Sequence, residues 1–183
     1  MVSTTMHDLS GSDNEPPEIP DELNSDYTDE RFKNCTRCGE TLADFPGGFQ
    51  ISKAWKRGEC VFEYALCDHC RTAMMEEFSK ESKDRLAKFQ DERVFFGGGL
   101  QQCSVCQKPR VEGNDSDFVI TGVCEGDRML HGIMVCGKCG EQTQELLSKH
   151  TKDTWRRFKD ENFPGPPGDE VLEPVEPFAT MLT

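Results

Sequence analysis

Eight of the ten cysteines in this 183-residue chain form four Cys-x-x-Cys pairs, and their spacing constrains the fold more than any other feature. The pairs are Cys35/Cys38, Cys67/Cys70, Cys103/Cys106 and Cys136/Cys139. There are 28 residues between the first pair and the second, and 29 between the third and the fourth. Two residues between cysteines suit a tight turn that presents both sulfurs to one ion. The spacing therefore predicts two sequential metal sites of four thiolates each.

Disulfides or redox-active thiols are the alternative use of so many cysteines, and the N-terminal residues argue against them. Residues 1–20 have no basic start and no apolar run, so we expect no signal peptide. No stretch of the sequence is long and apolar enough to cross a membrane. In a reducing compartment, paired cysteines are more often metal ligands than disulfides. We therefore predict a soluble cytoplasmic protein that binds no membrane.

The net charge of −13 is concentrated at the two ends of the chain. Residues 1–30 hold nine acidic side chains and residues 164–183 hold four, and neither segment has a Lys or Arg. Residues 31–163 therefore balance 21 acids against 21 bases. Segments rich in Pro, Ser, Asp and Glu bury too little apolar surface to offset the entropy of ordering. We predict disordered acidic tails at residues 1–30 and 164–183.

The second half of the chain repeats the first. When Cys67 is placed over Cys136, residues 67–92 align with residues 136–161 without a gap, and ten of the 26 positions are identical. Background composition would give roughly one or two matches. This offset of 69 residues indicates a duplicated unit. We predict one module at residues 31–98 and a second at residues 99–163.

Each unit has the same order of local patterns. A Cys-x-x-Cys pair is followed by a turn-rich loop (residues 44–48 and 112–115), two short strands around a turn (residues 56–59 and 125–127), and then the second pair. Apolar residues at three- and four-residue steps predict a helical segment after that pair. Ser79 and Ser148 lie where this segment either bends or ends and is capped again. Trp155 replaces Leu86 in the repeat and is predicted to be a core residue.

A knuckle, a β-hairpin and a Cys pair on the first helical turn resemble a treble-clef (zinc-ribbon-like) zinc finger, here twice in tandem over about residues 33–163. The resemblance implies a small, metal-stabilised α+β fold. It also implies one site formed by Cys35, Cys38, Cys67 and Cys70 and another formed by Cys103, Cys106, Cys136 and Cys139. Treble clefs occur in nucleic-acid readers, ribosomal proteins, adaptors and enzymes, so the resemblance specifies metal binding and leaves the function open.

Two structural Zn²⁺ ions are the metals that these sites favour. Four thiolates make a closed tetrahedral site, and a helix N-terminus favours thiolate over thiol. Units of about 65 residues have small cores and often need such a staple. Iron bound as in a rubredoxin is the alternative, because the two knuckles of that family have a similar separation. The sequence departs from its usual Cys-Pro-x-Cys-Gly motif at Asp68 and Gly137.

The residues outside the four pairs indicate no catalytic site. Cys60 and Cys124 are not at equivalent repeat positions and are predicted to be idle or buried thiols. His7, His69, His131 and His150 have no suitable neighbour in sequence for a catalytic triad. The sequence also has no Gly-rich phosphate loop, no His-Glu-x-x-His motif and no nucleophile elbow. We predict a protein that is not an enzyme.

The predicted function is a zinc-binding module that interacts with another protein. The C-terminal tail mixes apolar and acidic residues, a pattern that can dock on a partner. Nucleic-acid binding is one alternative, because a basic helix face can meet phosphates. The basic residues of the second helical segment are Lys149, Lys152, Arg156, Arg157 and Lys159. An iron or thiol redox protein is the other alternative.

Overall fold

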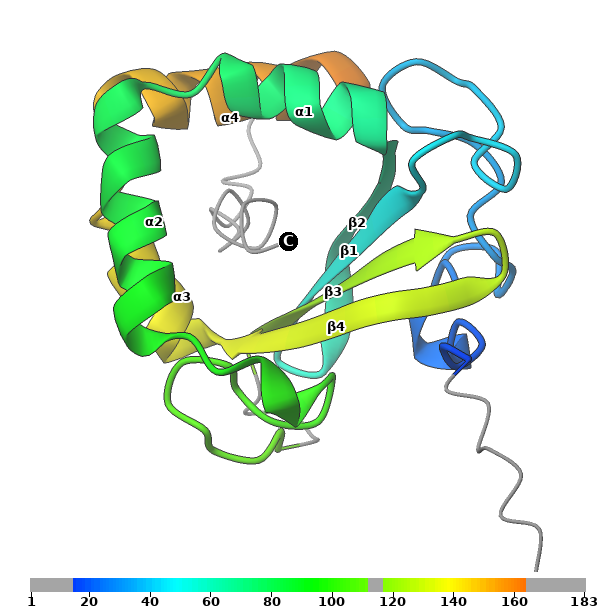
Figure 1. The fold of residues 1–183 in the computed structure, drawn as a ribbon, viewed down its shortest axis with the longest axis horizontal. Coiled ribbons are helices and arrows are strands. Elements are labelled where there is room, and N and C mark those ends of the chain that lie inside the picture. The colour runs from blue at the N-terminus through cyan, green and yellow to red at the C-terminus, as the bar shows by residue number, and fades with distance from the viewer. Residues whose placement is uncertain (1–14, 112–116, 164–183) are drawn as a thin grey trace, which may run out of the picture.

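The computed structural model describes residues 15–111 and 117–163 and shows a small α+β fold (Figure 1). The predicted tail at 164–183 and the predicted loop at 112–115 lie outside the described residues. Two short 3-10 turns are Asp21–Leu23 and Phe96–Gly98. The strands are β1 (Phe49–Lys56), β2 (Glu59–Cys67), β3 (Phe118–Glu125) and β4 (Arg128–Cys136). The helices are α1 (Asp68–Glu76), α2 (Lys80–Arg93), α3 (Gly137–Gln144) and α4 (Lys149–Asn162).

The two hairpins form one antiparallel sheet with the strand order β2-β1-β3-β4. β1 and β3 pair at the centre, where Ser52 lies opposite Thr121 and their hydroxyls are 3.0 Å apart. These two residues are 69 positions apart. The predicted modules at residues 31–98 and 99–163 each contain one hairpin, and the boundary between them in the sheet lies between β1 and β3. The sheet therefore continues across that division.

Each post-hairpin segment consists of two helices. Ser79 is the N-cap of α2 and accepts a hydrogen bond from the amide of Ser82, and Ser148 caps α4 in the same way through Thr151. A capping hydroxyl satisfies one of the free amides at a helix start. The sequence allowed either one bent helix or two helices after each hairpin. The structure has two helices in both halves, and a serine caps the second of them.

The elements of the two halves recur at one spacing. Phe49 and Phe118 begin β1 and β3, and Glu59 and Arg128 begin β2 and β4. Each pair of residues is 69 positions apart, as are the first residues of α2 and α4. Both hairpins also have a bulge at the same place, where Val61 and Leu130 have no cross-strand partner. Corresponding residues of the two hairpins therefore occupy corresponding positions in the sheet.

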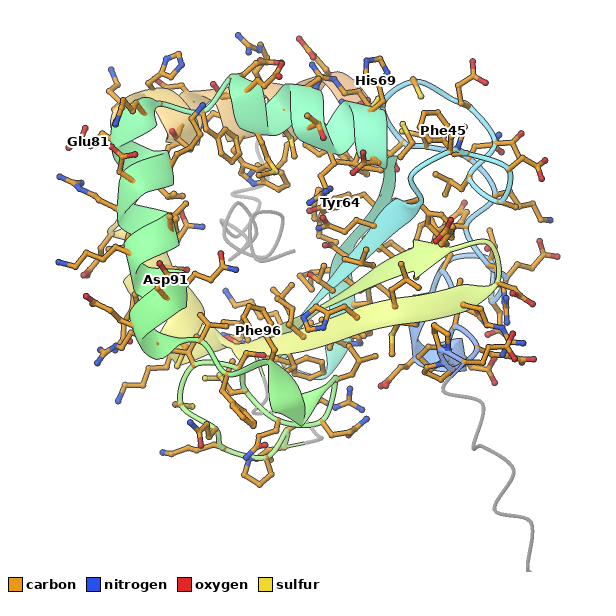
Figure 2. The ribbon with its side chains drawn as sticks, in the orientation of Figure 1. Phe45, Tyr64, His69, Glu81, Asp91 and Phe96 are labelled. Carbon is orange, nitrogen blue, oxygen red and sulfur yellow. The ribbon has the colours of Figure 1, made fainter. Side chains whose placement is uncertain are left out.

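The helices pack on one face of the sheet. Tyr64 of β2 points toward them (Figure 2), and its ring lies 5.8 Å from that of Trp155 and 5.7 Å from that of Phe158 on α4. Trp155 is buried, which confirms its predicted place in the core. Because Trp155 and Phe158 come from the second half and Tyr64 from the first, the last helix of the second half packs on the hairpin of the first.

The predicted disorder of residues 1–30 is wrong for residues 15–30, whereas residues 1–14 lie outside the described residues. Ile19 and Leu23 are buried in the core, and Leu23 packs where any side chain at Gly122 would clash. Two neighbouring backbone bonds, from Ile19 to Asp127 and from Met129 to Pro17, hold this segment on β4. The segment is acidic in composition, but it contains two apolar side chains, Ile19 and Leu23. Their burial offsets the entropy cost of ordering the segment.

No described helix combines the length and the apolar character that a membrane span requires.

Candidate metal centres

The first candidate centre joins a loop to the junction between β2 and α1. Cys35 and Cys38 lie on a tight turn closed by the hydrogen bond from the amide of Gly39 to the carbonyl of Cys35. Cys67 ends β2 and caps α1, and Cys70 lies on the first turn of that helix. The four sulfurs all lie within 4.8 Å of one another. The sequence-predicted group of Cys35, Cys38, Cys67 and Cys70 is therefore assembled in space.

The second centre repeats this construction. The amide of Gln107 bonds to the carbonyl of Cys103, and Cys136 ends β4 immediately before α3. The sulfurs of Cys103, Cys106, Cys136 and Cys139 also lie within 4.8 Å of one another. Each turn is fixed to its hairpin by one backbone bond of 2.8 Å, from Thr36 to Ala65 and from Ser104 to Met134.

The donor geometry fits a tetrahedral metal ion. The sulfurs of Cys38 and Cys67 are 3.8 Å apart, and so are those of Cys106 and Cys136. A zinc–sulfur bond of about 2.3 Å places the corners of a regular tetrahedron about 3.8 Å apart. A disulfide bond needs about 2.05 Å between the sulfurs, and none of the ten cysteines is joined to another in this way. The spacing agrees with coordination and not with disulfide bonds.

Backbone amides point at the sulfurs of both centres. The amide of Cys67 donates to the sulfur of Cys35 and that of Cys136 donates to Cys103, each at 3.4 Å. The amide of Cys70 donates to the sulfur of Cys67, also at 3.4 Å. Hydrogen bonds from N–H groups favour the thiolate over the thiol. At Cys35 and Cys103 these bonds help to lower the thiol pKa, whereas burial raises the pKa of Cys67 despite the bond from Cys70.

The thiol pKa values within each centre diverge. Burial opposes ionisation of Cys35, but hydrogen bonds from the amides of Cys38 and Cys67 outweigh it and lower the pKa of Cys35 to about 7. A hydrogen bond from the side chain of Cys136 is the main cause that lowers the pKa of Cys103 to about 4. Burial raises the pKa of Cys70, and it raises that of Cys139 to about 12. A bound cation would deprotonate these remaining thiols as well.

The two centres differ in their exposure to solvent. Each centre has one exposed cysteine, Cys38 in the first and Cys106 in the second. Cys136 of the second centre is half-buried, whereas its counterpart Cys67 in the first is buried. A hollow of about 590 Å³ adjoins Cys136 and is lined in part by Lys108, Lys138 and Glu141. The second centre is therefore more accessible to a chelator or an oxidant.

A third group of potential ligands, Asp26, Cys60 and Glu63, is partly neutralised by a lysine. The side chain of Lys53, only 1% exposed, forms an ion pair with Asp26 and lies 3.7 Å from Glu63. Its ammonium group supplies the positive charge that a metal ion would bring. Sequence reasoning did not find this cluster, because nothing in the pattern around Lys53 distinguishes it from an exposed strand lysine.

Two of the basic residues predicted on α4 form ion pairs with carboxylates. Arg157 forms an ion pair with Glu77, and Arg156 lies 3.2 Å from Asp153. Lys149 is exposed, Lys152 is half-buried, and Lys159 lines a groove beside β2. Lys149, Arg156 and Arg157 are thus exposed, whereas Lys152 and Lys159 are half-buried.

Two cysteines and three histidines of the described residues are not members of either four-cysteine group. Burial raises the pKa of Cys60 and that of Cys124 to about 12, which favours the protonated thiol at neutral pH. Burial also lowers the pKa of His131, whose ring packs 5.0 Å from that of Phe96. His150 contacts the carbonyl of Glu77 at 3.0 Å, and His69 lies on α1 (Figure 2).

Searches of family models, curated proteins and solved structures find no match to this chain. The fold and the sites by themselves define a small α+β protein with two four-cysteine groups that can hold metal ions, consistent with a zinc-finger-like class.

Proposed function

We propose that this chain is a zinc protein in which two structural Zn²⁺ ions hold together a non-enzymatic protein-interaction module. The observation that carries the proposal is the pair of four-sulfur groups, whose 3.8 Å sulfur separations suit tetrahedral Zn²⁺. Cys35, Cys38, Cys67 and Cys70 would hold one ion. Cys103, Cys106, Cys136 and Cys139 would hold the other.

Each half is proposed to be a treble-clef finger, and the two to have arisen by duplication. Supporting this, each half has a cysteine turn, a hairpin and a helix that begins at the last strand cysteine. The common 69-residue spacing of strands and helices also supports it. The proposal includes a reducing, cytoplasmic environment, where eight thiolates persist as ligands.

A structural role follows from the chemistry of the ligands. Four sulfurs fill the coordination sphere of Zn²⁺, whereas catalytic zinc keeps one position for water or substrate. The ions would link the loops, the sheet and the first turn of α1 and α3. With no role for the ions in catalysis, the proposed function of the fold is to present a surface that binds another protein.

Elemental analysis and native mass spectrometry of protein purified without added metal test the proposal. Two zinc ions per chain, and unfolding by a chelator, are expected. Coloured, iron-loaded protein would replace structural zinc with an electron-transfer role. Metal-free protein that keeps its fold through disulfides would contradict the proposal as a whole.

Nucleic-acid binding is a weaker candidate for the same module. The ion pairs of Arg156 and Arg157 with carboxylates leave fewer charges for phosphates. Binding to duplex DNA or RNA that weakens steeply with salt, and that is lost in Lys149→Glu, would favour it over a protein partner.

A further inference from the structure

A groove of about 680 Å³ runs along the outer edge of β2. Its floor is residues 60–63 of that strand. One wall is formed by residues 25–27 and the other by the end of α4, with Lys159, Asp160 and Phe163. β2 is an edge strand, so its outer backbone groups are available to a further strand unless another segment covers them.

Apolar side chains are exposed in this groove. Val61, the bulge residue of β2, is 46% exposed, and Tyr27 on the facing wall is 94% exposed. Phe163, which also lines the groove, packs against Phe62 with ring centres 4.5 Å apart. Exposed apolar groups beside an edge strand are the features that bind extended peptides.

The other edge of the sheet shows how such a strand is bound. The amide of Met129 donates to the carbonyl of Pro17 at 2.8 Å, and the amide of Ile19 donates to Asp127 at 3.0 Å. Glu18 pairs with Arg128 in an antiparallel bridge, and the Glu15 carboxylate lies 3.2 Å from the same arginine. The chain's own acidic segment thus extends the sheet beside β4.

β2 presents the same geometry with the opposite charge. Glu59 corresponds to Arg128 and Cys60 to Met129 at the common spacing of 69 residues, and both hairpins have their bulge at the next residue. Among residues 15–111 and 117–163, no extended segment pairs with the outer side of Glu59 or Cys60. On the edge of β4, the basic Arg128 lies beside Glu15 and Glu18 of the bound segment. At the corresponding position of β2 the side chain is the acidic Glu59, which suits a basic residue of a partner.

We propose that the edge of β2 binds an extended peptide of a partner protein, antiparallel to β2, with apolar side chains over Val61 and a basic residue opposite Glu59. The inference rests on the proposed interaction function and names its surface. The charges on the groove walls agree with it. Asp26, Glu63 and Asp160 outnumber Lys159, and the buried Lys53 offsets one carboxylate. Residues 164–183, with four acids and no base, have the wrong charge for this position.

Selection of peptides on the full-length, zinc-loaded chain tests the proposal. A phage library of random dodecapeptides would be selected, and synthetic copies of the enriched sequences titrated into ¹⁵N-labelled protein. We expect apolar sequences with Lys or Arg, and amide shifts concentrated at residues 59–63. Val61→Asp should weaken binding by about tenfold or more. Leu130→Asp is the matched control, because Leu130 is the equivalent bulge residue on the edge that is already covered.

Charge reversal gives the second arm of the experiment. Glu59→Lys should shift the selected peptides from basic to acidic, as the glutamates beside Arg128 lead one to expect. Failure to enrich any peptide, or shifts that map away from β2, would overturn the proposal. So would displacement of the selected peptides by a synthetic copy of residues 164–183, or occupation of the groove by a second copy on raising the protein concentration.

The zinc content of the same samples separates the two proposals. A chain with two zinc ions whose peptides bind elsewhere refutes the β2 site alone. A folded chain without metal refutes the proposed function itself.

Discussion

The hydroxyl oxygens of Ser79 and Ser148 lie 2.8 Å apart, so the N-caps of α2 and α4 touch each other. The amide of Ser79 donates to the hydroxyl of Thr151 at 3.1 Å, and that of Ser148 donates to Ser82 at 2.8 Å. Each helix start thus satisfies an amide of the other half. Together with the Ser52–Thr121 contact in the sheet, this gives two places where residues 69 positions apart meet.

Loss of either cap should therefore affect both helices. Ser79→Ala and Ser148→Ala should each lower the free energy of unfolding by about 1 kcal/mol, the usual worth of an N-cap. Because the two hydroxyls bond to each other, the double variant should differ from the sum of the single variants by about 0.5 kcal/mol or more. Urea denaturation of all four proteins measures this coupling. Strict additivity would show that the two caps act independently.

Removing one metal ligand should destabilise both halves. Cys67→Ser is expected to abolish binding of one zinc ion and to lower the free energy of unfolding by more than about 5 kcal/mol, since zinc contributes about 10–16 kcal/mol in small zinc peptides. Because β1 pairs with β3, amide protection of β4 should fall as well. Native mass spectrometry and hydrogen exchange provide the two readouts. Cys60→Ser, which removes a thiol outside both centres, is the control, and native-like protection of β4 in Cys67→Ser would contradict the prediction.

Two glycines with positive φ should tolerate alanine very differently. Gly48 and Gly39 both have a φ of 78°, a conformation that costs an alanine about 1 kcal/mol. A Cβ at Gly48 would lie closer than 3.0 Å to the carbonyl oxygen of Cys124, whereas one at Gly39 would meet nothing within 4 Å. We expect Gly48→Ala to cost more than about 3 kcal/mol, because overpacking adds to the strain, and Gly39→Ala to cost only the strain. Equal melting temperatures for the two variants would argue against this packing.

Glu77 should make stability depend on pH in acid. Hydrogen bonding to Arg37 is the first cause that holds the pKa of Glu77 below its usual value, and the charge of Arg157 adds to it. A lowered pKa in the folded state stabilises the protein at a pH above the unfolded pKa, and this stabilisation is lost as the pH falls through the folded value. Because the side chain is 35% exposed, its loss should cost at most about 1 kcal/mol.

Comparing two glutamine variants isolates this effect from acid release of the metal. Glu77→Gln should be less stable than wild type at pH 7 in urea denaturation, and the difference should shrink in acid. Glu76→Gln, at the exposed neighbouring position, should leave stability unchanged. A chemical-shift titration that gives Glu77 an ordinary pKa would refute the ion pairs.

The sequence predicted the local parts of the fold well. The turn at Cys35 and the alternation of Phe62, Tyr64 and Leu66 depend on residues close together in the chain. At Ser79 and Ser148 the sequence left a bent helix and a new capped helix both open, and the structure has the new helix in both places. Such patterns follow from the periodicity of strands and helices and from capping chemistry. The grouping of the cysteines was equally readable, because thiolates of this spacing have few other uses.

The pairing of β1 with β3, which joins the two hairpins, could not be predicted from local sequence patterns. β1 is buried on both faces, and its buried residues include Gln50, Ser52 and Lys53, which indicate an exposed strand when read alone. Their polar groups find partners only through other segments, as when Lys53 meets Asp26 and Ser52 meets Thr121. The burial of Ile19 and Leu23 could not be predicted for the same reason, because nothing in an acidic segment indicates which surface it will cover.

By itself, then, the sequence determined the cysteine pairs, the order of strands and helices, and their spacing of 69 residues, because each depends on chemistry within a few neighbouring residues. Only the tertiary structure decided that β1 pairs with β3, that residues 15–30 pack on the sheet, and that no other strand of the described residues pairs with the outer side of β2 at Glu59 and Cys60. The physical reason is that sheets are joined by backbone groups common to every residue. A strand's sequence shows which of its faces is apolar, but the partner strand is selected by the packing of the whole chain.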